Sequence, residues 1–126
     1  MRKISKIIVH CSDSPHSHHD DIAVIDHWHK ARGWRGVGYH YFIQANGNVQ
    51  KGRAESQVGA HTAGHNHDSI GICLHGRLDF TKNQFHALKT LLYDLMKKYD
   101  LYTTDVYGHR DFEKRKTCPN FDVRNI

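Results

Sequence analysis

The sequence predicts an α/β fold, in which a central mixed β-sheet is flanked by α-helices within one domain. Three observations predict this fold. Short runs rich in Ile and Val have the character of buried strands, and two longer segments carry apolar residues at helical spacing. The third observation is that no linker, repeat or low-complexity tract divides the 126 residues, a length that suits one core. We therefore expect residues 1–126 to form a single domain.

The N-terminal part of the chain is predicted to hold one strand and one helix. Residues 3–11 place apolar side chains on both faces of an extended segment, which indicates a central strand covered on two sides. A loop follows, and its histidines are expected to face solvent. Asp20 or Asp21 then begins a helix that continues to about Arg32. Gly33 suits the C-terminal cap of this helix because glycine tolerates the left-handed conformation.

The middle of the chain is predicted to form three strands and a long loop. Residues 39–44 are typical of a strand, and the pair Asn46-Gly47 predicts a hairpin turn into a third strand over 49–51. Residues 52–69 are irregular and rich in Gly and His. Such a long loop in a small domain is more often functional than idle. Residues 70–76 then form a short, apolar, buried strand.

A second helix and a last strand complete the predicted fold. Thr81 caps the helix, and Gln84, three residues later, completes a capping box. A short strand over 106–108 then leads directly to His109. The apolar face of the helix is expected to belong to the core and consists of Phe85, Leu88, Leu91, Leu92, Leu95, Met96 and Tyr99.

Composition narrows the possible partners and compartment. The net charge is +5 with His neutral, which favours anionic partners such as nucleic acid, an anionic membrane surface or the bacterial cell wall. Nucleic acid is not favoured, because no compact stretch interleaves Arg with aromatic residues. Three cysteines cannot all pair within one chain, which suggests a reducing compartment or a thiol that binds metal. We expect cytoplasmic synthesis without a signal peptide, and no membrane insertion.

The C-terminal segment contains the strongest chemical signal. His109 and Cys118 lie nine residues apart, and Lys116 comes two positions before the cysteine. Imidazole and thiolate are both good zinc ligands, but a catalytic zinc needs a third protein ligand. His10, at the end of the first strand, is the best candidate. Taken alone, this histidine would more often be a hydrogen-bonded core residue, so the fold has to bring the three together.

These residue types suit metal-assisted amide hydrolysis. Three protein ligands leave the fourth zinc position free for water, whose pKa zinc lowers towards about 7. The ammonium of Lys116 could stabilise the oxyanion of a tetrahedral intermediate. The hydroxyl of Tyr39 could orient the water or relay its proton. His61, in the long loop, is a further candidate. The chain has neither an HExxH sequence nor a CxxC pair, so spacing alone is only moderately specific.

Taken together, a series of short runs resembles the type-two family of zinc-dependent N-acetylmuramoyl-L-alanine amidases. This family includes phage lysozyme-type amidases and is related to animal peptidoglycan recognition proteins. The runs span nearly the whole chain in the order and spacing of the family, and the similarity is greatest to the phage-type enzymes. The matching runs are 8–12, 28–30, 38–40, 46–47, 58–61, 66–72, 108–109 and 116–122.

The resemblance implies roles for seven residues. His10, His109 and Cys118 match the ligands of one Zn²⁺ per chain, Tyr39 and Lys116 match the catalytic residues, and His40 and His61 match positions that line the substrate cleft. The implied reaction is hydrolysis of the amide bond between N-acetylmuramic acid and L-alanine in peptidoglycan. A phage-type endolysin, which lyses the host from within, is the implied biological role.

Two other functions remain open at this stage. Some relatives are peptidoglycan-recognition modules without catalysis, but those typically lack the cysteine ligand. Some phage-type relatives also bind an RNA polymerase, so a regulatory partner is possible by resemblance only. The chain ends at Ile126, soon after the last matching run, so we expect no wall-binding module. We expect a monomer that reaches the wall after release from the cytoplasm.

Overall fold

One five-stranded mixed sheet organises the structure, a computed structural model that describes residues 2–125. The strands lie in the spatial order β3-β2-β4-β1-β5. Strand β1 runs parallel to both β4 and β5, and β2 runs parallel to β4 but antiparallel to β3. The main elements are β1 (Lys6–Cys11), α1 (Ile22–Ala31), β2 (Tyr41–Ile43), β3 (Val49–Lys51), β4 (Ser69–Leu74), α2 (Lys82–Tyr99) and β5 (Val106–Gly108). The predicted fold class is confirmed.

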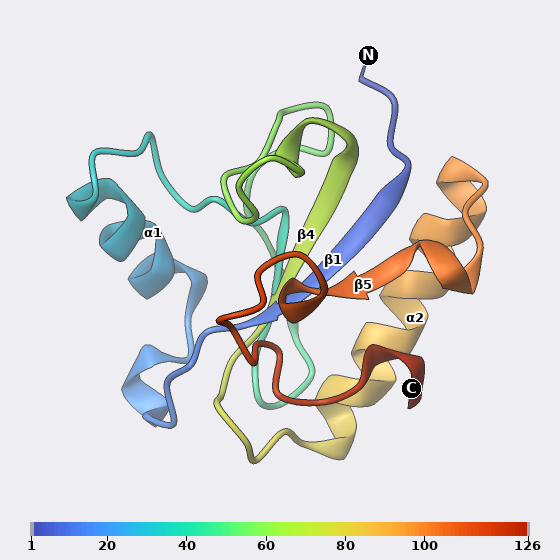
Figure 1. Cartoon of the computed structure of the whole chain (residues 1–126). Coiled ribbons are helices and arrows are strands. Elements are labelled where there is room, and N and C mark those ends of the chain that lie inside the picture. Colours follow the sequence, from blue (N-terminus) through green and yellow to red (C-terminus); the bar gives the residue numbers. More distant parts are fainter. Residues whose placement is uncertain (1, 126) are drawn as a thin grey trace.

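The two helices cover opposite faces of the sheet (Figure 1). On the α2 side, Leu88, Leu92 and Leu95 pack against Ile and Val side chains of β1 and β4 in the larger core cluster. On the α1 side, a smaller cluster forms around Ile25 and Phe42. Because side chains alternate along a strand, β1 supplies one face to the α2 core and the other, with His10, to the α1 side.

Strand register brings the first and last parts of the chain together. Val9 pairs with Gly108, so that His10 and His109 follow as the next residues on two adjacent parallel strands. The carboxyl ends of parallel strands meet at one edge of a sheet, which is where α/β proteins commonly build their sites. His109 begins a short 3₁₀ turn, η4 (His109–Asp111), and the chain then crosses back over the end of β1 (Figure 1).

The long loop is fixed by polar contacts at its start. The carboxylate of Glu55 accepts hydrogen bonds from the hydroxyls of Tyr41 and Tyr99 and, at 2.9 Å, from Nζ of Lys98. These donors belong to β2 and α2, so the loop is attached to both the sheet and a helix. Arg2 adds a hydrogen bond to the backbone oxygen of Glu55 at 3.0 Å. The loop is therefore part of the folded scaffold.

The predicted helix caps are present, whereas several strand limits differ from those expected. Asp21 caps α1, Gly33 follows the helix with φ of 88°, and the capping box of Thr81 with Gln84 begins α2. The first strand begins at Lys6 and the second at Tyr41, so Tyr39 and His40 precede the strand in which we placed them. No helix within the described residues is long and apolar enough to cross a membrane.

Candidate active site

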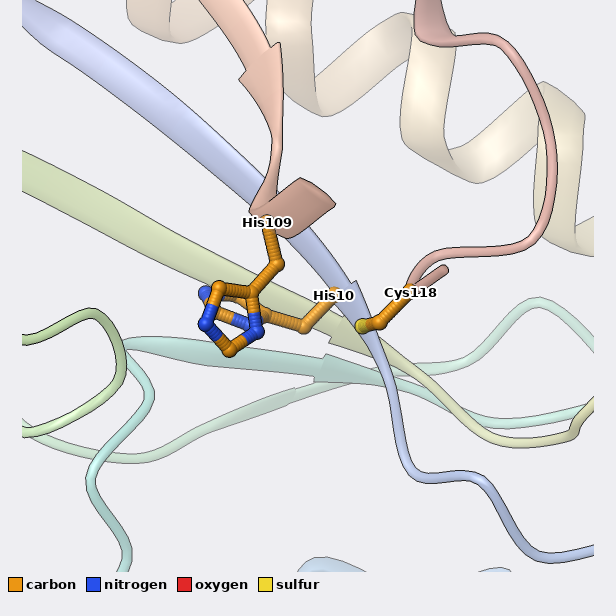
Figure 2. Close-up of side chains that lie close together, drawn as sticks. All are labelled: His10, His109 and Cys118. Carbon is orange, nitrogen blue, oxygen red and sulfur yellow. The ribbon is translucent and has the colours of Figure 1, made fainter. Parts of the chain in front are cut away.

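Three potential metal ligands converge at the carboxyl edge of the sheet. His10 is the last residue of β1 whose side chain lies on the α1 face of the sheet. His109 follows β5, and Cys118 lies on the C-terminal segment (Figure 2). One ligand atom from each lies within 4.8 Å of the other two. The rings of His10 and His109 lie 4.6 Å apart between centroids. Among the described residues this is the one group of three or more such side chains with this geometry.

Backbone contacts hold Cys118 beside the end of β1. Its Sγ accepts a hydrogen bond from the backbone N–H of Cys11 at 3.0 Å, and its carbonyl oxygen accepts one from the N–H of Arg110 at 2.9 Å. A hydrogen bond to a thiolate stabilises its charge. The first bond holds the sulfur against the end of β1, although Cys11 and Cys118 are 107 residues apart, and the second anchors the Cys118 backbone beside His109.

The protonation states of the three side chains suit a cation. Burial lowers the pKa of His10 well below its usual value, and the neighbouring His61 and His109 lower it further. Burial, followed by the charge of Lys116, also lowers the pKa of His109. Both imidazoles are therefore neutral lone-pair donors at pH 7. The Cys11 thiol and burial raise the pKa of the Cys118 thiol, so a thiolate there needs a positive charge beside it.

A cleft of about 1010 Å³ opens above these ligands. Tyr39 lines it with its ring centroid 5.0 Å from that of His10, and burial raises the pKa of its hydroxyl well above the usual value, which keeps the hydroxyl protonated. Lys116 lines the cleft as an exposed side chain. Other lining residues include Trp28, His29, Arg32, Trp34, Arg77, Arg115 and Asn120.

His61 and His40 occupy different positions relative to the cleft. His61 lines it and contacts His10, with 2.9 Å between His61 Nδ1 and His10 Nε2. His40 is 1% exposed and is not among the lining residues. Its Nδ1 accepts the backbone N–H of Gly71 at 3.0 Å, and its Nε2 lies 2.8 Å from the carbonyl oxygen of Gln57. These contacts join β4 to the long loop, and the expectation that His40 lines the substrate cleft stays a prediction.

The other two cysteines are not members of the ligand group. Cys73 is fully buried in the apolar cluster beneath α1, as expected for a cysteine that behaves as a small hydrophobe. Cys11 is also buried, and it contributes its backbone N–H to the sulfur of Cys118.

A comparison with protein families identifies the family of the chain. Residues 1–121 match the family model described as N-acetylmuramoyl-L-alanine amidase. The chain belongs to this family. The match covers nearly the whole chain and includes all seven residues that the resemblance singled out.

Individual relatives support the phage-type assignment. An endolysin of Enterobacteria phage T3 is 40% identical over 126 residues, with 94% of this chain and 82% of the relative covered. The amidase LysC from Clostridium intestinale has a TM-score of 0.86 at 32% identity, with 96% of this chain and 79% of that one covered. Drosophila PGRP-LB follows with a TM-score of 0.82 at 25% identity, and the alignment covers 94% of this chain and 76% of that one. The predicted family and enzyme class are confirmed: this chain is a phage-type peptidoglycan amidase.

Sequence reasoning missed several residues that shape this amidase site. Thr62 Oγ1 lies 3.3 Å from His10 Nε2, and His29 Nδ1 accepts the backbone N–H of Gly38 at 2.8 Å. Asn66 and Ser69 contact the His61 segment. Asn66 and Ser69 belong to a run that resembles the family, but no sequence pattern indicates that their side chains contact His61, several residues earlier in the chain.

The position of His40 yields a stability prediction. His40→Ala removes the acceptor for the buried N–H of Gly71, so we expect the free energy of unfolding to fall by about 1–3 kcal/mol in urea denaturation. His67→Ala is the matched control, because the His67 side chain is 73% exposed. This substitution should change the free energy of unfolding by less than about 0.5 kcal/mol. A His40→Ala variant as stable as the parent would mean that this hydrogen bond does not support the fold.

Proposed function

We propose that this amidase binds one zinc ion through His10, His109 and Cys118 and uses it to hydrolyse the amide bond between N-acetylmuramic acid and L-alanine. The observation that carries the proposal is the convergence of these three side chains at the base of a large cleft. We further propose that residues 1–126 are one amidase domain, because the ligands come from both ends of the chain. Since one chain supplies all of them, we propose that it acts on the wall as a monomer.

The donor set fits zinc in particular. Two neutral imidazoles and one thiolate are ligands that zinc accepts, and three protein ligands are typical of its catalytic sites. The thiolate compensates half of the ion's charge, so the site would retain a net charge of about +1. In return, the cation would offset the effects that raise the pKa of Cys118. Calcium and magnesium prefer oxygen ligands, and these three side chains supply none.

The cleft residues supply the remaining parts of a hydrolytic site. Zinc held there would supply Lewis acidity, which makes water more acidic and withdraws charge from a carbonyl oxygen. We assign the protonated hydroxyl of Tyr39 to hydrogen bonding at the reacting centre, because its ring packs beside His10. We assign the ammonium of Lys116 to stabilising the negative charge that develops on the substrate carbonyl oxygen.

The charge of the cleft suits a peptidoglycan stem peptide. Arg32, Arg77, Arg115 and Lys116 line it, with Asp13 as an acidic residue that pairs with Arg77, so positive charge is in excess, and stem peptides carry carboxylates. Opposite charges attract an anionic substrate into a cleft and raise its local concentration. The basic side chains therefore complement the peptide part of the substrate, on which the cleaved amide bond lies.

Product analysis on purified peptidoglycan tests the proposed reaction. The amidase should release stem peptides with new L-alanine amino groups and create no new reducing sugar ends, since a glycosidase would do the reverse. Removing zinc with a chelator should abolish release, and adding zinc back should restore it. New reducing ends without new amino groups, or full activity of a metal-free preparation, would contradict the proposal.

Zinc content measured in cysteine variants tests the ligand set. Cys118→Ser should lose most of its zinc, because a neutral hydroxyl replaces an anionic thiolate. Cys118→Asp should recover part of it, since a carboxylate also binds zinc. Cys11→Ser and Cys73→Ser are the matched controls and should retain one zinc per chain. Loss of zinc from Cys11→Ser with retention in Cys118→Ser would overturn the assignment.

Steady-state kinetics separate the catalytic side chains from the ligands. Lys116→Ala and Tyr39→Phe should retain zinc and lose mainly kcat, by on the order of 10²–10³-fold for an oxyanion donor. Lys114→Ala and Tyr93→Phe are the controls, since both side chains are exposed outside the cleft. If the cleft variants turn over as fast as the controls, the catalytic roles are wrongly assigned.

A further inference from the structure

His61 contacts the metal ligand His10 directly. Its Nδ1 lies 2.9 Å from Nε2 of His10, and the two rings meet edge to face with centroids 5.0 Å apart. Oγ1 of the adjacent Thr62 lies 3.3 Å from the same nitrogen of His10. The long loop therefore places two polar groups at Nε2, and the hydrogen bonds of the His10 ring leave Nδ1 as the nitrogen for a metal.

The contacts of His61 are compatible with the tautomer that a metal on Nδ1 of His10 requires, in which Nδ1 of His61 accepts; this nitrogen also lies 3.0 Å from Oγ1 of Thr62. A neutral imidazole has one nitrogen that donates and one that accepts. Nε2 of His61 lies 3.2 Å from Oγ of Ser69, which can accept a hydrogen bond. With its proton on Nε2, His61 presents the lone pair of Nδ1 to the N–H of His10. Both rings are then satisfied, and this arrangement is the one in which Nδ1 of His10 keeps its lone pair for a metal.

The ring of His61 is held in place from several sides. A Cβ atom at Gly71 would lie 2.5 Å from Cδ2 of His61, and one at Gly59 would lie 2.7 Å from it. Both positions thus need glycine for the ring to lie flat against the sheet. Oδ1 of Asn66 accepts the backbone N–H groups of His61 and Thr62, each at 2.9 Å. The structure therefore fixes both the ring and its backbone.

We propose that His61 is a positioning residue for the metal: it accepts the Nε2–H of His10 and so holds the ring in the orientation that directs Nδ1 towards the cation. This inference rests on the proposed zinc site and replaces the substrate-binding role that the sequence suggested for His61. Histidine ligands commonly donate their second N–H to such a partner, and loss of the partner costs about 10–100-fold in metal affinity.

The neutral character of this partner has a chemical consequence. A carboxylate in the same place would orient His10 equally well, but it would also add a negative charge beside the ion. His61 orients the ligand without adding charge. The proposed site would therefore keep its net charge of about +1, which favours negative charge developing on the substrate oxygen.

Zinc affinity of the purified full chain tests this role by competition with a chelating dye. His61→Leu should raise the zinc dissociation constant by about 10–100-fold. His61→Asn should recover most of the affinity, because its side-chain oxygen occupies nearly the position of Nδ1. His61→Gln, whose amide reaches the position of Nε2 instead, should recover less. His67→Ala, in the same loop, should bind zinc as the parent does.

The outcomes separate this inference from the zinc site itself. If the parent binds zinc and His61→Leu binds it equally well while its KM rises, His61 contacts substrate and the inference is overturned. If the parent binds no zinc, the site and the inference fail together. Circular dichroism checks that each variant folds. Should His61→Leu not fold, the comparison of His61→Asn with His61→Gln decides, and equal affinities would overturn the inference.

Discussion

The parallel pairing of β1 with β5 is the constraint on which the site depends. Val9 pairs with Gly108, and the next residue on each strand is a histidine. Two side chains from opposite ends of the chain thus lie side by side without any local interaction between them. Apolar packing of β1 and β5 against α2 stabilises this register. A shift of one residue in either strand would turn its side chains to the other face and move a histidine out of the site. The larger core therefore supports the site indirectly, by holding the register of the two strands.

The two faces of the sheet have separate tasks. The α2 side is packed with aliphatic side chains, whereas the α1 side includes His10, Tyr39 and the glycine positions that admit the ring of His61. The C-terminal segment then completes the site through the hydrogen bond from Cys11 N–H to the sulfur of Cys118. Burial on this face keeps the histidines neutral, which suits ligands for a cation. The same desolvation makes a thiolate costly unless a cation is bound.

Features of the fold and the site that depend on residues close together in the sequence could be predicted, whereas contacts between distant residues could not. Local signals were sufficient for the capping box of Thr81 and the last strand before His109. The apolar character of both faces correctly indicated that β1 is a covered, central strand. The contacts of His40 could not be predicted, because it precedes β2 and its ring turns towards the backbone of Gly71. The contact between His10 and His61 joins residues 51 positions apart, so no local pattern could reveal it. Ligand chemistry suggested the grouping of His10, His109 and Cys118, and the resemblance to a family strengthened it, but no local pattern showed how the fold brings them together.

X-ray absorption spectroscopy at the zinc edge tests the proposed ligand set, because it reports the atoms bound to the metal in the purified protein. Coordination by His10, His109 and Cys118 should give one sulfur at about 2.3 Å and two imidazole nitrogens at about 2.0–2.1 Å, with one light atom completing the shell. In Cys118→Ser loaded with excess zinc, the sulfur contribution should disappear. A shell without sulfur in the parent protein, or one with two sulfurs, would contradict a site built from His10, His109 and Cys118.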